Sequence, residues 1–287
     1  MISDPQPQPH RFFDGGTDEE PPDTGARARI VLERDVQGGR ELFQMLRRIG
    51  YLDEDLGELL VPRDLATFRT DLTSVPALFT WLVPRTGNIL PPALLHDGLV
   101  EPGASYLGPP MERPTADRVL RRAMRDTHVG TVRRWLVWAA VTLWTIQVGT
   151  RSWSRLRHLR YVVAADGTLA VIAVLGILAT LDLFDVVDWV PWMGDRPWWL
   201  ELVGGLAGAV VVPLLLGLTW GRFAAAGVIA GVALAVLLHV TAALALLTLL
   251  YQAAERLVRR APVLTAAGAT VLVLACAVLT GVLVASA

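Results

Sequence analysis

Hydrophobic positions divide the chain into two parts that meet near Tyr161. Beyond this residue, runs of Ala, Leu, Val and Gly approach the roughly 20 apolar residues that a helix needs to cross about 30 Å of hydrocarbon. These runs lie near residues 168–184, 200–219, 223–250 and 263–285. They predict an all-α transmembrane bundle of about four helices over residues 161–287, preceded by a basic linker over residues 151–160.

In the first part of the chain, apolar residues recur at the spacings of short strands and amphipathic helices, as in a small globular domain. Residues 28–34 alternate in the manner of a strand, with residues 57–62 and 67–70 as its predicted partners. Residues 41–50 carry apolar side chains at helical spacing and end in Gly50, which predicts an amphipathic helix with a glycine stop.

Prolines open three further predicted helices in this part. Ser74 precedes Pro76 and an apolar run, so it fits the N-cap of a helix that has proline in its first turn. Pro91 and Pro114 start the other two helices, which carry the polar residues His96, Asp97 and Asp117. The predicted fold class is a small α+β domain, mostly helical with a short sheet, over residues 26–150.

The apolar stretch 135–148 is about 14 residues long, a length more typical of a buried or interfacial helix than of a span. If it crossed the membrane, the basic segment 151–160 would face outside, against the positive-inside tendency. We therefore assign the stretch to the domain and expect it to lie on the bilayer through Trp135, Trp138 and Trp144.

Charge and composition argue against nucleic acid as a partner and favour a cytoplasmic position for the domain. The chain has 26 basic residues, all Arg, and 27 acidic residues, so it lacks the basic excess of a nucleic-acid binder. Residues 1–25 are rich in proline and acidic residues and lack the features of a signal peptide, which predicts a disordered tail and a cytoplasmic domain. We expect a multi-pass protein of the cell membrane, with the lipid bilayer as one partner. A protein partner, or self-association through the bundle, is a further expectation.

Candidate chemistry is concentrated between Asp71 and Asp117. The carboxylates of Asp71, Asp97 and Asp117 would suit a divalent cation such as Mg²⁺ or Mn²⁺, with His96 as general base or fourth ligand. A zinc centre with several histidines is disfavoured because the chain has only five, and its single cysteine, Cys276, lies in the last apolar run.

The same residues also have a structural interpretation, which stays open beside the chemical one. Asp71 would then end a turn, Ser74 would cap a helix, and His96 would bond Asp117 to tie two helices together. Two functions follow from these interpretations: a hydrolase that uses acid–base or metal chemistry, and a non-catalytic scaffold or interaction module. A transporter is disfavoured because the predicted spans carry few central polar groups besides His239.

An ordered set of motifs resembles a family of phage and bacterial proteins that is catalogued as domain of unknown function thirteen fifty-three. The motifs are the runs 70–76, 93–97, 116–120, 123–124 and 133–135, and the resemblance covers about Leu59 to Thr150. It implies that five residues belong together, namely Asp71, Ser74, His96, Asp97 and Asp117. It brings no established activity and does not extend to the transmembrane part.

Two positions depart from the pattern of that family. Members have a Gly-Phe turn shortly before the Thr-Asp pair, whereas this chain has the run 63–68. They also carry Tyr three residues after the Asp of the His-Asp pair, where this chain has Val100. A tyrosine hydroxyl that served a site at this position would therefore be missing here.

Overall fold

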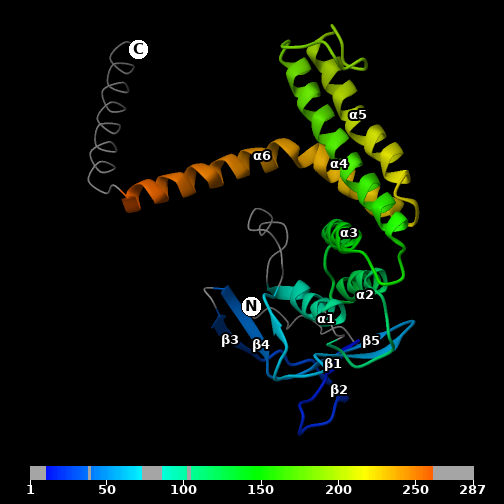
Figure 1. Ribbon diagram of the computed structural model, residues 1–287, viewed down its shortest axis with the longest axis vertical. Coiled ribbons are helices and arrows are strands. Elements are labelled where there is room, and N and C mark those ends of the chain that lie inside the picture. Colours follow the sequence, from blue (N-terminus) through cyan, green and yellow to red (C-terminus); the bar gives the residue numbers. More distant parts are fainter. Residues whose placement is uncertain (1–10, 38–39, 73–85, 102–104, 261–287) are drawn as a thin grey trace, which may run out of the picture. The chain divides into compact units, whose positions relative to one another are not determined.

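The computed structural model describes residues 11–37, 40–72, 86–101 and 105–260. The chain divides into two compact units, Met1–Leu238 and His239–Ala287, and the helix α6 (Ala224–Arg260) runs across the division. The α+β domain and the next two long helices belong to the first unit, together with the start of α6 (Figure 1).

The strands of the domain are short and pair antiparallel. In chain order they are β1 (Phe12–Asp14), β2 (Asp23–Arg27), β3 (Leu32–Gln37), β4 (Arg40–Met45), β5 (Ile49–Asp53), β6 (Gly57–Val61) and β7 (Arg69–Thr70). One sheet has the order β2-β1-β5-β6 and the other the order β3-β4-β7. In the first, Tyr51 pairs with Leu59 and with Phe12, which places the aromatic rings of Phe12 and Tyr51 4.8 Å apart.

The predicted helix over residues 41–50 is wrong, because this segment forms β4 and the start of β5. Its apolar residues serve two sheets instead of one helix face: Met45 pairs with Leu32 on β3, and Ile49 pairs with Val61 on β6. Gly50 does not stop a helix. A Cβ there would lie 2.2 Å from the ring of Phe13, so the glycine makes room for this phenylalanine on the neighbouring strand.

The predicted disordered tail over residues 1–25 is wrong for Phe12–Asp14, which forms the inner strand β1. Phe12 and Phe13 are both buried, and the burial of their apolar surface stabilises this strand. The average composition of residues 1–25, which is rich in proline and acidic residues, does not reveal these two aromatic side chains. The strand expected over residues 28–34 begins at Leu32 and pairs with β4, whereas residues 57–61 pair with β5.

Helices cover one side of the strands (Figure 1). They are α1 (Leu90–Val100), α2 (Arg113–Asp126) and α3 (Thr131–Val148). Prolines stand in the first turns of α1 and α2, as predicted, where the missing amide hydrogen leaves no carbonyl unpaired. Leu94 and Leu95 of α1 and Val119 of α2 pack in one core with Tyr51 and Val61 of the sheet. The helix expected after Ser74 lies outside the described residues.

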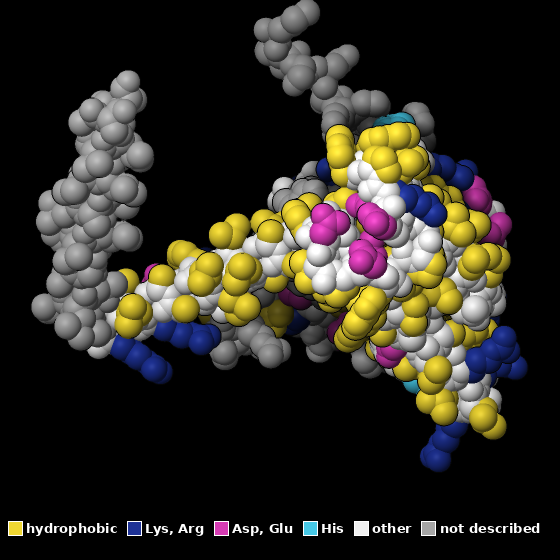
Figure 2. Space-filling view, turned by 90° about the horizontal axis from the view of Figure 1, so that it is seen from above, with side chains coloured by type: hydrophobic (Ala, Val, Ile, Leu, Met, Phe, Trp, Pro, Cys, Tyr) yellow, Lys and Arg dark blue, Asp and Glu magenta, His cyan; other side chains and the backbone are white. Residues whose placement is uncertain are grey.

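Three long apolar helices follow the domain, which confirms the fold class predicted from the sequence. The candidate spans are α4 (Arg155–Leu183), α5 (Trp198–Leu218) and the segment Gly221–Arg260, which contains α6. Within the most apolar window of each helix, 17%, 17% and 0% of the residues are buried, so their outer faces are left for an apolar environment. Figure 2 shows hydrophobic side chains along these helices. The fourth predicted span, near residues 263–285, lies outside the described residues.

Small residues allow these helices to approach closely. A Cβ at Gly217 of α5 would lie 2.5 Å from the backbone nitrogen of Val228 on α6. A Cβ at Gly231 would lie 2.9 Å from both Pro213 on α5 and Ile172 on α4. Glycine therefore sets the backbone distance between these helices. The helix α4 begins at Arg155, inside the segment 151–160 that we expected to be a linker.

Candidate functional site

His96 and Asp117 form a buried pair that joins α1 to α2. The imidazole Nε2 lies 2.8 Å from Asp117 Oδ1, and the exposed fractions of the two residues are 8% and 1%. With the proton on Nε2, the ring donates to the carboxylate and is held in one tautomer. The pair therefore fixes the orientation of the imidazole and the spacing of the two helices.

Asp97, the next residue on α1, faces a different partner. Its Oδ2 accepts a hydrogen bond of 2.6 Å from the Thr70 hydroxyl at the end of β7. The same hydroxyl oxygen accepts the amide of Leu72 at 2.9 Å, so Thr70 connects the start of the next segment to α1.

Burial raises the pKa of the Asp97 carboxyl to about 6, because an ionised carboxylate is poorly solvated at this position. The hydroxyl of Thr70 and the charge of His96 lower this pKa, and the carboxylates of Asp71 and Glu101 raise it, but burial is the largest cause. Asp97 therefore holds its proton into a range where an exposed aspartate has lost it.

His96 pairs with the candidate residue Asp117, whereas Asp97 bonds to Thr70 instead. Successive residues of an α-helix point about 100° apart, so His96 turns to α2 while Asp97 turns to β7. Among the described residues, no group of three or more His, Cys, Asp or Glu side chains is arranged to hold a metal ion. Asp71, Asp97 and Asp117 are all described, and they do not form such a group. Ser74 and Pro76, the candidate structural residues, lie outside the described part of the chain.

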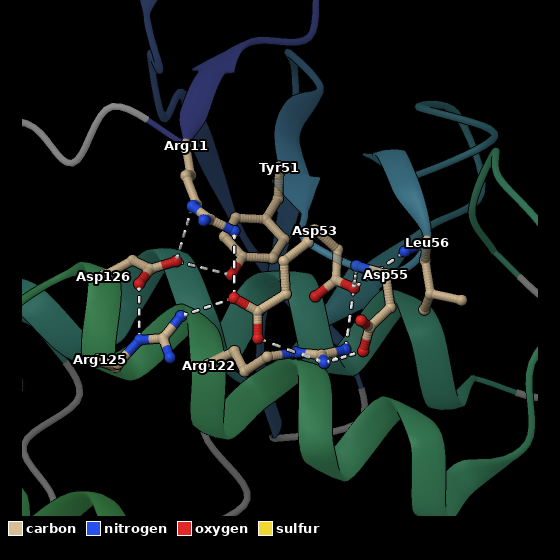
Figure 3. Close-up of polar contacts among 9 residues, drawn as sticks. Arg11, Tyr51, Asp53, Asp55, Leu56, Arg122, Arg125 and Asp126 are labelled. Carbon is tan, nitrogen blue, oxygen red and sulfur yellow. Dashed lines mark hydrogen bonds and ion pairs between the residues drawn. The ribbon is translucent and has the colours of Figure 1, made fainter.

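A second polar cluster, which sequence reasoning missed, joins the turn between β5 and β6 to α2 (Figure 3). Arg122 donates to Asp53 at 2.9 Å and also pairs with Asp55. Arg125 donates to Glu54 at 3.2 Å. We call this set the turn–helix network; it consists of Arg11, Tyr51, Asp53, Glu54, Asp55, Arg122, Arg125 and Asp126.

The acidic turn is organised by Asp53, whose side chain is fully buried. Its Oδ1 accepts the amides of Asp55 and Leu56 at 3.0 and 3.1 Å and the guanidinium of Arg122 at 2.9 Å. Three donors on one oxygen offset the cost of removing the charge from water. A run of three acidic residues between two strands, and two arginines three residues apart on a helix, were the available sequence signals.

Tyr51 connects the network to the core. Its hydroxyl donates to Asp126 at 2.9 Å, while its ring packs among the strands. Burial, reinforced by the charge of Asp126, raises the pKa of the tyrosine hydroxyl well above its usual value. The hydroxyl therefore stays protonated and serves as a hydrogen-bond donor.

A hollow of about 640 Å³ lies beside this network. Its lining residues are Asp55, Leu56, Pro110, Met111, Glu112, Thr115, Arg118 and Arg122. Acidic, basic and apolar groups are mixed, and Arg122 is already paired with the acidic turn. The pairs His96–Asp117 and Thr70–Asp97 do not line it.

Comparisons with known proteins bear on the domain. No curated protein and no solved structure matches the chain. One family model matches, and its match runs from β4 into α3, over about a third of the chain. The match includes His96, Asp97 and Asp117, together with most of the turn–helix network. Residues 43–141 therefore form a domain of the family described as "Protein of unknown function (DUF1353)".

Proposed function

We propose that this chain is a multi-pass membrane protein that holds its DUF1353 domain at the inner face of the cell membrane as a non-catalytic docking module. The observation that carries the docking role is that His96 and Asp97, adjacent on α1, each tie this helix to a different element, through Asp117 on α2 and Thr70 on β7. A catalytic or metal site requires side chains that converge on a common point.

Both pairs connect elements of the domain core. His96 and Asp117 join α1 to α2, and Thr70 and Asp97 join β7 to α1. The turn–helix network adds a third connection, between the β5–β6 turn and α2. These connections support a structural role for the buried polar groups, and the partner that we propose for the docking module is a protein or a second copy of the chain.

The orientation at the membrane is proposed from the charges that flank the helices. Arg151, Arg155, Arg157 and Arg160 are exposed at the start of α4, and positive charge favours the cytoplasmic side. The loop between α4 and α5 instead carries exposed acidic residues and tryptophans, which suits the outer headgroup region (Figure 2). The exposed residues of this loop include Asp185, Asp188, Trp189, Trp192 and Asp195.

Reporter fusions test this orientation. Fusions after Thr150 and Arg222 are expected to report the cytoplasm, and fusions after Asp195 and Arg260 the outside. An external report at Thr150 would overturn the proposed placement of the domain. A cytoplasmic report at Arg260 would contradict the predicted count of four spans.

A second candidate function is a hydrolase in which His96 acts as general base. The observation in its favour is the carboxylate of Asp117 at 2.8 Å from Nε2, because a carboxylate behind an imidazole orients the ring and stabilises its protonated form. In this function, Asp97 would supply a second acid–base group near His96, and a divalent cation such as Mg²⁺ or Mn²⁺ would be the metal to test with Asp71, Asp97 and Asp117.

One variant separates the two functions. The docking module predicts that His96→Ala weakens the fold, since Asp117 then loses its buried partner. The hydrolase predicts that His96→Ala stays folded and loses cleavage of an ester or phosphoester substrate. Assays of the full chain in lipid nanodiscs, with and without Mg²⁺ or Mn²⁺, would measure both properties.

A further inference from the structure

The outer face of α3 is apolar and exposed, although α3 is not one of the candidate spans. We use this name for Ala140, Trp144 and Val148, which follow one another at four-residue spacing on the exposed side of the helix, with Arg133 on the same side near its start. The exposed fractions of Trp144 and Val148 are 62% and 51%. Large apolar side chains at this exposure are costly in water, so the face is a candidate for a covering surface.

The other two tryptophans of α3 have a partner within the domain. Trp135 and Trp138 pack edge to face, with their ring centroids 5.3 Å apart. The guanidinium of Arg121 on α2 lies 4.3 Å from the Trp135 ring and 5.3 Å from the Trp138 ring, so it stacks against both. These two tryptophans therefore fix α3 to α2, and Trp144 is the indole that faces outward.

Hydrogen bonds fix the end of α3 beside the first turns of α4 (Figure 1). Gln147 donates to Asp166 at 2.6 Å, and His158 Nε2 lies 2.9 Å from the carbonyl oxygen of Ile146. Asp166 stands 11 residues after Arg155, the first residue of α4, which is about 17 Å along the helix at 1.5 Å per residue. The end of α3 therefore lies at the level of the first three turns of α4.

The length of α4 places this level at the membrane surface. Its 29 residues correspond to about 43 Å, whereas the hydrocarbon core is about 30 Å thick. Charged residues are most frequent in the first turns of the helix, while Thr180 and Asp182 stand near its other end, so we assign most of the excess of about 13 Å to the first turns. These turns, which contain His158, would occupy the headgroup layer together with the end of α3, and Asp166 would lie at the inner edge of that layer.

Exposed arginines surround this level. They are Arg133 near the start of α3, and Arg151, Arg155, Arg157 and Arg160 around the start of α4. Within the described part of the chain, no carboxylate pairs with any of these five guanidiniums. Anionic lipid headgroups would supply the complementary charge.

We infer that α3 lies in the headgroup layer of the cytoplasmic leaflet, with its outer face toward the acyl chains and the five arginines against anionic headgroups. This inference rests on the proposed membrane anchorage and adds a lipid-binding surface to it. The combination of an apolar face, an exposed tryptophan and flanking arginines is that of an interfacial helix.

Spin labels on the full chain in nanodiscs test the position of α3. Cys276 is the only cysteine, so a Cys276→Ala background allows single labels at Trp144→Cys, at Val210→Cys and at Val36→Cys. Val210 lies in the middle of α5, and Val36 lies on β3; both are exposed, at 52% and 60%. Relaxation by oxygen reports lipid, and relaxation by a water-soluble nickel complex reports water.

The expected result is a Trp144→Cys label with an oxygen-to-nickel ratio between those of the other two labels. A Trp144→Cys label that matches the Val36→Cys label, while the Val210→Cys label lies in lipid, would overturn the inference and leave the membrane anchorage intact. If the Val210→Cys label were also in water, the anchorage itself would fail.

Lipid composition tests the role of the arginines. Phosphatidylglycerol in the nanodisc is expected to move the Trp144→Cys label deeper than phosphatidylcholine alone. The double substitution Arg151→Gln and Arg155→Gln should remove this shift, whereas Arg27→Gln on β2, an exposed arginine of the domain, should preserve it. An equal depth in both lipids would overturn the anionic-headgroup contact.

Discussion

Asp117 on α2 contacts His96 on α1 through only one of its two carboxylate oxygens. Oδ1 lies 2.8 Å from the imidazole Nε2, while Oδ2 is buried and has no hydrogen-bond partner within the described residues. A buried carboxylate with a single partner is a costly group, and that cost rises steeply if the partner is removed.

We therefore predict that His96→Ala destabilises the domain by roughly 1 to 3 kcal/mol, since the Asp117 carboxylate is then left buried without its donor. Hydrogen exchange of the α1 and α2 amides in the full chain would measure the loss. The double substitution His96→Leu and Asp117→Leu is the control, because apolar groups in both positions remove the unpaired charge. An exchange pattern of His96→Ala equal to that of the wild type would contradict the prediction.

Asp97 gives the domain a stability that depends on pH. Its pKa is raised from 3.8 to about 6 in the folded chain, mainly by burial. Between about pH 4 and pH 6 the unfolded carboxyl has lost its proton while the folded one keeps it, so the folded state binds more protons. The contribution of Asp97 to stability is therefore greatest below about pH 4 and falls as the pH rises to about 6.

Asp97→Asn should remove this decline, because the amide stays neutral and its oxygen can still accept the Thr70 hydroxyl. At pH 7 the variant is expected to be more stable than the wild type, by at most about 3 kcal/mol, since one pKa unit corresponds to 1.36 kcal/mol. Thermal unfolding between pH 4.5 and 7.5 would measure the difference. A difference between the two proteins that does not change with pH would refute the assignment to Asp97.

The turn–helix network allows a comparison between two arginines on one helix. Arg122 pairs with the fully buried Asp53, whereas the side chain of Arg125 is 47% exposed. Arg122→Gln should therefore cost about 3 kcal/mol, because it removes the main cation from a buried carboxylate. Arg125→Gln should cost less than about 1 kcal/mol, as for an exposed ion pair. Urea unfolding of both variants would test this order, and equal losses would show that burial of Asp53 does not govern the network.

Local sequence signals predicted the elements whose ends carry proline and missed those that depend on distant partners. Pro91 and Pro114 place the starts of α1 and α2 correctly, because proline acts within its own turn. The apolar residues of segment 41–50 have helical spacing in the sequence. The segment nevertheless forms strands, because Leu32 pairs with Met45 and Val61 pairs with Ile49. The Gly-Gly pair at residues 38 and 39 was a hairpin signal that should have favoured strands over this helix.

One contact among the candidate residues could be predicted from the sequence. The resemblance pointed to His96, Asp97 and Asp117, and the structure brings His96 and Asp117 together as the structural interpretation required. The resemblance could not predict the bond between Asp97 and Thr70, because adjacent residues of a helix point in different directions. The position of Thr70 also depends on the pairing of β7 with β4, which is not visible in the motif. The acidic turn and Arg122 were missed because residues about 70 positions apart carry no local signal of their contact.

Two glycines in the apolar helices provide a matched test of helix packing. Gly217 of α5 approaches the backbone of Val228 so closely that a Cβ would lie 2.5 Å from its nitrogen, whereas a Cβ at Gly167 of α4 would meet no atom within 4 Å. Gly217→Ala must therefore push α5 away from α6, because the backbone of Val228 cannot rotate aside as a flexible side chain would. Gly167→Ala is expected to be neutral or to stabilise the chain by up to about 1 kcal/mol, the helix propensity difference between the two residues. Unfolding of the full chain in mixed micelles would show a loss for Gly217→Ala alone; an equal response of the two variants would mean that α5 and α6 do not pack through this contact.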